Sequence, residues 1–217
     1  MSEKLTAVVL DGYTLNPGDL SWDGLHQVAE SRIHDRTPAE LIVERARGAQ
    51  ILFTNKTPLS AETLAQLPDA RYIGVLATGY NIVDVAAARK QGIVVTNIPT
   101  YGTASVAQFA FALLLELCHQ AGKHSEAVRR GDWGRSADWC FQLSPQVELA
   151  GLTIGIVGFG RIGRQLGKIA DAVGMRVVAH DTNQVNAPDY EGFAWLGLEE
   201  LLATADVVSL HSPLFPE

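Results

Sequence analysis

The sequence predicts an α/β protein made of two successive series of parallel β-strands and connecting helices. Short β-rich runs alternate with helical patterns along the chain, which is typical of parallel sheets with helical crossovers. The strand candidates are continuously apolar, as expected when helices cover both faces of a sheet. A stretch at residues 103–123 is apolar nearly all round and separates the two series.

The first series occupies residues 1–98 and is predicted to form one α/β domain. Pro38 is expected at the first position of a helix, Ser60 at a helix N-cap, and Gly92 just past a helix end. The expected strands are 7–10, 31–34 (a weak pattern), 51–54, 72–77 and 93–96, and the expected helices are 21–30, 39–47, 61–66 and 83–90.

Residues 99–147 break this alternation. A long helix is expected at 103–123, buried between layers or domains because it lacks a polar face. Residues 124–147 are predicted to be an irregular excursion. Its aromatic side chains favour a subunit arm, since exposed aromatic residues often mark interfaces; they include Trp133, Trp139 and Phe141.

The second series, residues 148–217, predicts part of a dinucleotide-binding domain. Its expected strands are 153–157, 176–180 and 206–210, and its expected helices are 161–173 and 198–203. A six-stranded fold built from two such halves needs about as many residues again, so only the first half is expected here. Its fourth strand, which faces the first across the cofactor crevice, is expected to be absent.

Composition excludes several classes of partner. The chain has 217 residues and a formal net charge of −7, without a cluster of Lys or Arg, which argues against nucleic acid and anionic membranes. The most apolar run, 109–118, is too short to span a bilayer and contains Glu116. Cys118 and Cys140 fit neither a metal spacing nor a disulfide framework, and no signal peptide is recognisable; both observations predict a cytoplasmic protein without a metal site.

A glycine-rich turn carries the functional signal of the second series. Gly158, Gly160 and Gly163 follow an apolar strand and open an amphipathic helix, which is the context that a dinucleotide-binding motif requires. Gly158 permits the tight turn, Gly160 lets the backbone approach a pyrophosphate, and Gly163 lets the helix approach the strand. The backbone N–H groups at the helix start, which include those of Arg161 and Ile162, are expected to bind the anion. The Arg161 side chain either adds a phosphate contact or is simply solvated.

Asp181 is the second part of this motif. It follows Gly163 by 18 residues and ends the next strand, where a carboxylate accepts hydrogen bonds from both adenosine ribose hydroxyls. Its charge repels a 2′-phosphate, which favours NAD over NADP. A purely turn-forming aspartate before Thr182-Asn183 is the competing interpretation.

With these residues in place, the chain resembles the D-isomer-specific 2-hydroxyacid dehydrogenases, and among them the glycerate dehydrogenase (hydroxypyruvate reductase) branch. The resemblance covers essentially the whole chain through four blocks in the same order, LATGYNIVD at 76–84, NIPTYGTASVAQ at 97–108, ELAGLTIGIVGFGRIG at 148–163 and SLHSPLFPE at 209–217. It implies a flavodoxin-like substrate domain, a Rossmann NAD-binding domain and a homodimer formed through residues 100–147. The implied reaction reduces hydroxypyruvate or glyoxylate to D-glycerate or glycolate.

The resemblance also implies ligand-binding residues. The backbone of Ala77, Thr78 and Gly79 would hold the carboxylate of a small 2-keto or 2-hydroxy acid, and successive N–H groups at a strand end can do this; a plain strand-to-helix turn is the alternative. Thr103 matches a position near the nicotinamide, although a helix N-cap explains it equally well. Ser212 and Pro213 match the loop over the adenosine side of the cofactor.

The family's catalytic Arg, Glu and His follow the last of the four blocks, so no catalytic residue is expected within 1–217, and this chain alone is expected to show negligible activity and weak NAD affinity. His119, His124, His180 and His211 are not expected to replace them. Another substrate of the family, such as phosphoglycerate or lactate, remains an alternative, with Lys56 and Arg71 the only basic residues near the 77–79 loop. A non-catalytic, NAD-sensing corepressor-like protein is the alternative from another class.

Overall fold

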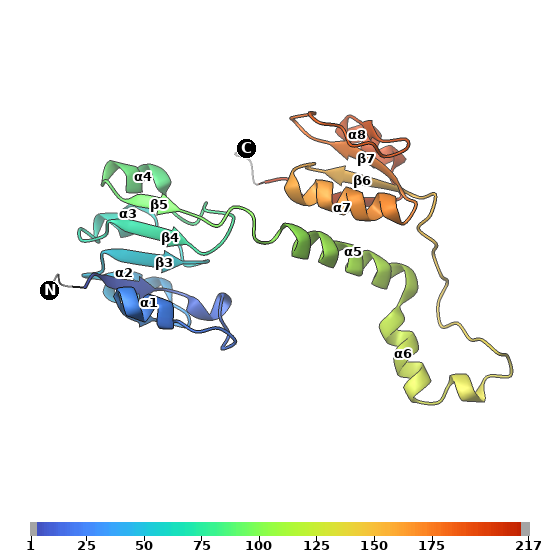
Figure 1. Ribbon diagram of the computed structural model, residues 1–217, viewed down its shortest axis with the longest axis horizontal. Helices are drawn as coiled ribbons and strands as arrows, with labels where there is room; N and C mark the ends of the chain where they lie inside the picture. The colour runs from blue at the N-terminus through green and yellow to red at the C-terminus, as the bar shows by residue number, and fades with distance from the viewer. Residues whose placement is uncertain (1–3, 214–217) are drawn as a thin grey trace. The chain divides into compact units, whose positions relative to one another are not determined.

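The computed structural model describes residues 4–213, which form two compact units that divide between Tyr101 and Gly102 (Figure 1). The first three residues and the last four residues of the 209–217 block lie outside the described part. The helix and the arm expected at 99–147 belong almost entirely to the second unit.

The first unit is built on a five-stranded parallel sheet with the order β2-β1-β3-β4-β5. This is the flavodoxin-like order, so that expectation is confirmed. Because β1 lies between β2 and β3, the strand order reverses at the β1–β3 pair, and ligands in such sheets bind outside the carboxyl ends of the strands at that point. The strands are β1 (Thr6–Val9), β2 (Glu30–Ile33), β3 (Ile51–Thr54), β4 (Tyr72–Val75) and β5 (Val94–Thr96).

The helices of this unit begin near their expected caps. The Ser60 hydroxyl accepts the N–H of Thr63, and Gly92 has φ +72° just after a helix ends. Pro38 is an N-cap rather than the first helical residue, because its ψ of 151° is extended and a 3-10 turn intervenes before the α-helix. The elements are η1 (Gly12–Thr14), α1 (Asp23–Val28), η2 (Ala39–Leu41), α2 (Ile42–Ala46), α3 (Ala61–Ala65) and α4 (Val85–Lys90).

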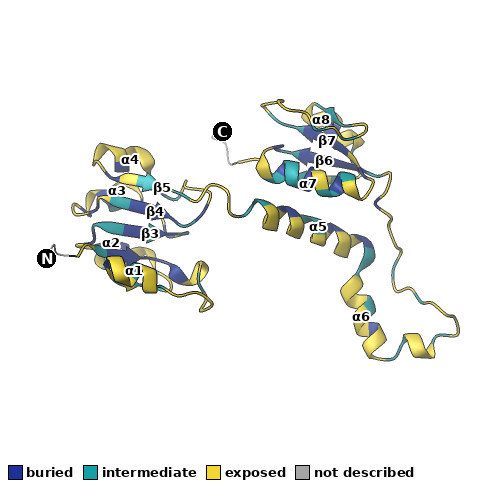
Figure 2. Ribbon diagram, in the orientation of Figure 1, coloured by how far each residue is buried: buried dark blue, intermediate teal, exposed yellow. Residues whose placement is uncertain are grey.

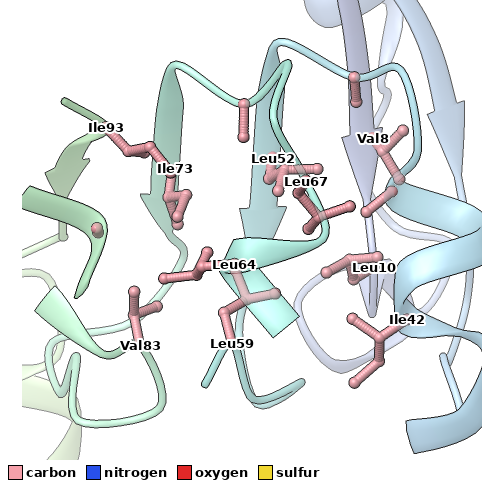
Figure 3. Packing of buried hydrophobic residues seen from close by; sticks show 14 of the residues in the cluster. Val8, Leu10, Ile42, Leu52, Leu59, Leu64, Leu67, Ile73, Val83 and Ile93 are labelled. Carbon is pink, nitrogen blue, oxygen red and sulfur yellow. The ribbon is translucent and has the colours of Figure 1, made fainter. Parts of the chain in front are cut away.

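One apolar core lies between this sheet and its helices. Side chains from β1, β3 and β4 meet those of the helices α2 and α3, and Leu10, Leu52 and Ile73 are fully buried among them (Figure 3). Burial of this kind, at about 25 cal/mol per Å² of apolar surface, supplies the main driving force for folding the unit.

The expected helix at 103–123 is two helices, α5 (Thr103–His119) and α6 (Ala121–Arg129), which meet at a bend of 59°. Gln120 has φ +47° and ψ +47°, a left-handed conformation that ends α5. α5 packs on helix α7 (Arg161–Ala172) through Ala107, Leu114 and Cys118, while its other face is exposed within the unit (Figure 2). The helix was expected to be buried between layers or domains, and within the second unit it is buried on one face only.

The arm at 124–147 is more ordered than expected. Its first residues complete α6, and a 3-10 turn, η3 (Trp133–Arg135), follows. His124 donates from Nδ1 to the Gln120 carbonyl and accepts the Leu143 N–H at Nε2, over 3.0 and 3.1 Å. The Trp133 indole N–H donates to the Trp139 carbonyl over 2.9 Å, so the returning segment is fastened to α6 and η3.

The sheet of the second unit has four parallel strands in the order β8-β7-β6-β9. The strands are β6 (Thr153–Val157), β7 (Arg176–His180), β8 (Ala194–Trp195) and β9 (Val207–Leu210), with a helix α8 (Leu198–Thr204) between the last two. β8 has only two residues and was not predicted, so β9 is the fourth strand and not the third. It pairs with β6 on the side opposite β7, and the expected absence of the facing strand is wrong.

In the described part of the chain, no single helix is both long and apolar enough to cross a membrane. The bent pair α5–α6 alone passes that test, on length and composition.

Candidate functional site

The glycine turn after β6 has the geometry that its sequence predicts. Gly158 has φ +89°, and a Cβ there would overlap the backbone of Ser212 beyond the end of β9. A Cβ on Gly163 would overlap the carbonyl oxygen of Gly158, so α7 can lie this close to the strand only with glycine. A Cβ on Gly160 would meet nothing within 4 Å, which leaves the backbone open to an approaching group.

Helix α7 begins at Arg161, and its N-cap Gly160 has no side chain that could cap the helix. The first N–H groups of a helix have no acceptor within the helix itself and carry the positive end of its dipole. The Ile162 side chain packs on the core of the unit, so only its backbone is available to a ligand. The Arg161 side chain is exposed at the helix start. This end of α7 can therefore receive an anion.

Asp181 follows β7, and its carboxylate accepts one hydrogen bond from the glycine turn and one from the segment that follows β7. Its Oδ2 accepts the N–H of Phe159, the middle residue of the glycine turn, over 2.7 Å. Its Oδ1 accepts the N–H of Asn183 over 2.9 Å, which is the turn-forming role considered as the alternative. A carboxylate oxygen can accept more than one hydrogen bond, so the turn and a ribose contact are compatible.

A cavity of about 310 Å³ lies at the carboxyl ends of β6, β7 and β9, where it borders Gly158 and Asp181 but not the residues 160–163 at the start of α7. Four of the predicted residues line it, namely Gly158, Asp181, Ser212 and Pro213, and the sequence reasoning missed Val157, His180, Thr182 and Leu198. The missed residues lie next to the predicted motifs or, in the case of Leu198, begin α8. The ends of the predicted strands were the sequence signal that could have identified them. A glycine turn at one wall and a carboxylate at another fit the adenosine ribose and pyrophosphate of a dinucleotide.

Four of the six histidines make hydrogen bonds within the second unit. His211 shares a hydrogen bond of 2.8 Å with the Ser209 hydroxyl, and burial lowers the pKa of its imidazole. His180 donates from Nδ1 to the Leu196 carbonyl over 3.0 Å. His119 lies 3.2 Å from the Gln146 side-chain oxygen, and His124 makes the two arm contacts given above. None of the four is placed as a general acid by these contacts.

In the first unit, the 77–79 loop follows β4 and is fixed through its oxygens. The Thr78 hydroxyl donates to the Ile98 carbonyl over 3.0 Å, and the Thr78 carbonyl accepts the Asn97 side-chain amide over 2.8 Å. Among residues 4–213, no acceptor is found for the N–H groups of Ala77, Thr78 or Gly79. Three N–H groups in succession at a strand end can receive a carboxylate.

A buried carboxylate that sequence reasoning missed organises the neighbouring loop. Asp11 follows β1 and is 4% exposed. Its Oδ1 accepts the N–H of Asn55 over 2.8 Å, and its Oδ2 accepts those of Lys56 and Thr57. These residues follow β3, the neighbour of both β1 and β4, so the loop lies at the point where the strand order reverses.

Of the two basic residues expected near the 77–79 loop, only Lys56 lies at the same end of the strands, and the expectation for Arg71 is wrong. Lys56 follows the carboxyl end of β3, and Ala77 follows the carboxyl end of the neighbouring strand β4. Arg71 precedes β4 and lines a hollow with Lys4 and Glu30 at the amino ends of the strands. Thr103, expected near the nicotinamide, is the first residue of α5; Gly102 is the N-cap, so the N-cap explanation for Thr103 is wrong by one residue.

In the second unit the order β8-β7-β6-β9 places its third, second, first and fourth strands side by side. This order, the glycine turn and the carboxylate at the end of β7 define a dinucleotide-binding α/β protein. Residues 111–217 match the model of the D-isomer specific 2-hydroxyacid dehydrogenase NAD binding domain. The chain therefore belongs to the D-isomer specific 2-hydroxyacid dehydrogenases, and its second unit carries the NAD-binding domain of that family.

Three relatives show how far the similarity extends. The chain is 52% identical over 213 residues to a hydroxypyruvate reductase of Blautia hydrogenotrophica, covering 97% of this chain and 66% of the relative. It is 41% identical over 181 residues to a glycerate dehydrogenase of Methylorubrum extorquens, covering 83% and 55%. The crystal structure of the TT0316 protein from Thermus thermophilus aligns with a TM-score of 0.81 at 32% identity, covering 98% of this chain and 66% of that one. The chain thus spans between about half and two thirds of the length of these proteins.

Proposed function

We propose that the protein is an NAD-dependent D-2-hydroxyacid dehydrogenase that reduces hydroxypyruvate or glyoxylate to D-glycerate or glycolate. The crevice at the ends of β6, β7 and β9 is the observation that carries the proposal, because it brings the glycine turn and Asp181 together at the strand-order reversal. The similarity to a hydroxypyruvate reductase and a glycerate dehydrogenase supports this choice of substrate.

The residues of this chain would bind and orient the reactants. The first turn of α7 receives the pyrophosphate, with Arg161 beside it, and Asp181 receives the adenosine ribose hydroxyls. The N–H groups of Ala77, Thr78 and Gly79 receive the substrate carboxylate. When bound, the nicotinamide supplies the hydride. We assign no acid or base for the proton to any residue of the described chain.

The proposal is tested by steady-state reduction of a panel of 2-keto acids with NADH, using the protein as its own gene encodes it. We expect hydroxypyruvate and glyoxylate to be reduced with the highest kcat/KM. Equal values for hydroxypyruvate and pyruvate would contradict the glycerate assignment. Since β9 is present beside β6, the 217-residue chain should bind ADP-ribose measurably.

Cofactor choice gives a second prediction. Asp181→Asn keeps an oxygen that can accept the Phe159 N–H but removes the charge that repels a 2′-phosphate. We expect the ratio of the NADPH to the NADH dissociation constant to fall by about tenfold or more, as the loss of one like-charge contact implies. Asp189→Asn, in the same connection between β7 and β8, is the matched control and should leave the ratio unchanged. An unchanged ratio in Asp181→Asn would refute the role of its charge.

We further propose that two copies associate through residues 100–147. On α5, Phe109, Leu113 and Leu117 are 66%, 53% and 78% exposed within the unit, and Trp139 on the arm is 88% exposed. Leu113 and Leu117 also line a hollow beside β9. Apolar surface of this extent favours a protein partner. Sedimentation at micromolar concentration should give a dimer, and the pair Leu117→Asp and Trp139→Ala should shift it towards monomer. Sedimentation as a monomer in the wild type would exclude this interface.

A further inference from the structure

Arg164 connects three parts of the second unit that border the crevice. It lies on α7 directly after Gly163 and is partly buried. Its guanidinium carbon lies 5.0 Å from the centre of the Phe159 ring, within the range of a cation–π contact. Its Nη1 donates to the Asn186 carbonyl over 2.6 Å, and its Nη2 donates to the Val185 carbonyl. One side chain therefore links the helix, the glycine turn and the segment after Asp181.

The segment at 182–188 depends on side-chain contacts for its position. It lies between β7 and β8 and forms neither helix nor strand. Asn186 has φ +53°, in the left-handed region, where a non-glycine residue needs support from its surroundings. Asp181, directly before the segment, accepts the Asn183 N–H, and Arg164 reaches the middle of the segment from another element. The two carbonyl contacts of Arg164 therefore tie the middle of the segment to α7.

The surface under Arg164 is fixed. Phe159 is 2% exposed, and its ring centre lies 5.3 Å from that of Phe193 and 5.4 Å from that of Trp195. A Cβ on Gly167 would lie only 3.2 Å from the Phe159 ring, so the ring also rests closely on α7. The Phe159 N–H in turn donates to Asp181. A displacement of Arg164 would therefore act on the segment and not on the ring.

We propose that Arg164 is a positioning residue for the adenosine end of the crevice. It holds residues 182–186 against α7, and so places Thr182 and Asp181, which line the cavity, before a cofactor arrives. It acts through the segment, whereas the neighbouring Arg161 stands at the helix start itself. The inference rests on the proposed NAD-binding role of the crevice and adds a residue to it.

The test compares Arg164→Ala and Arg164→Lys with Lys168→Ala, an exposed cation one turn further along α7. ADP-ribose is the probe, measured by calorimetry well below the melting temperature. We expect its dissociation constant to rise about tenfold in Arg164→Ala, since two hydrogen bonds to the segment are lost. Arg164→Lys should recover only part of the affinity, because its ammonium keeps the charge but cannot make both contacts in one plane. Lys168→Ala should bind as the wild type does.

Hydrogen exchange of the ligand-free protein gives the second measurement. Amides at 182–187 should exchange faster in Arg164→Ala, while those of β6 and β7 exchange at the wild-type rate; a loss of overall stability would accelerate all of them. Wild-type affinity for ADP-ribose in Arg164→Ala would overturn the inference and leave the proposed function standing. Failure of the wild type to bind ADP-ribose would instead overturn the proposed NAD-binding function, and the inference with it. If Arg164→Ala does not fold, Arg164→Lys decides by the same two measurements.

Discussion

Replacing Gly158 with alanine is expected to destabilise the second unit and to abolish dinucleotide binding. The residue has φ +89°, where an L side chain is strained by about 1–2 kcal/mol. The added Cβ would also overlap the backbone of Ser212. Because β9 is hydrogen-bonded to β6 just before this point, either the glycine turn or the end of β9 must move, and both border the crevice.

Gly160→Ala is the matched control for this prediction. Its backbone, with φ −77° and ψ −155°, is extended, and a Cβ would meet nothing within 4 Å. We expect this variant to melt at the wild-type temperature and yet to bind ADP-ribose more weakly, since the methyl group occupies the space left for the pyrophosphate. Thermal melting and calorimetry separate the two variants. A Gly158→Ala protein that melts and binds like the wild type would refute the turn geometry.

Replacing Asp11 with alanine is expected to destabilise the first unit by about 3 kcal/mol or more, since hydrogen bonds to a charged group are worth about 1.5–3 kcal/mol each. The carboxylate is buried and accepts three backbone N–H groups from residues 55–57. Alanine leaves these donors without their acceptor and releases the loop that carries Lys56. Substrate affinity should fall along with stability, because this loop lies beside residues 77–79.

Asp84→Ala is the control for Asp11. Asp84 also accepts a backbone N–H, that of Ala87, but it is exposed at the N-cap of α4, where such a loss costs about 1 kcal/mol. Since the chain divides into two compact units, stability is best read from hydrogen exchange of β1 and β3 amides rather than from one melting curve. Equal exchange in both variants would show that the buried carboxylate of Asp11 contributes no more to stability than the exposed one of Asp84.

Local patterns predicted most of the secondary structure. The strands 51–54, 153–157 and 176–180 were predicted to the residue, because continuous apolar runs between helical patterns have few other interpretations. Ser60 and Gly92 marked helix ends through contacts made within one turn. The break at Gln120 could not be predicted, since glutamine has no special preference for the left-handed region that ends α5.

The prediction about the crevice went wrong through one short strand. β8 has two residues, too few for any periodicity, so β9 was counted as the third strand and the facing strand was thought absent. Gly158, Asp181, Ser212 and Pro213 were nonetheless predicted to border one site, since each lies at the end of a strand. Family membership was also predictable, because its motifs are contiguous in the sequence.

The sequence by itself determined the glycine turn, the strands and most helix ends, because these depend on steric and hydrogen-bonding limits that act over a few residues. Only the tertiary structure decided that β9 lies beside β6, that Asp11 bonds to a loop more than forty residues away, and that Arg164 holds residues 185 and 186. These contacts join segments that no local pattern relates. Their geometry follows from how the sheets and helices pack.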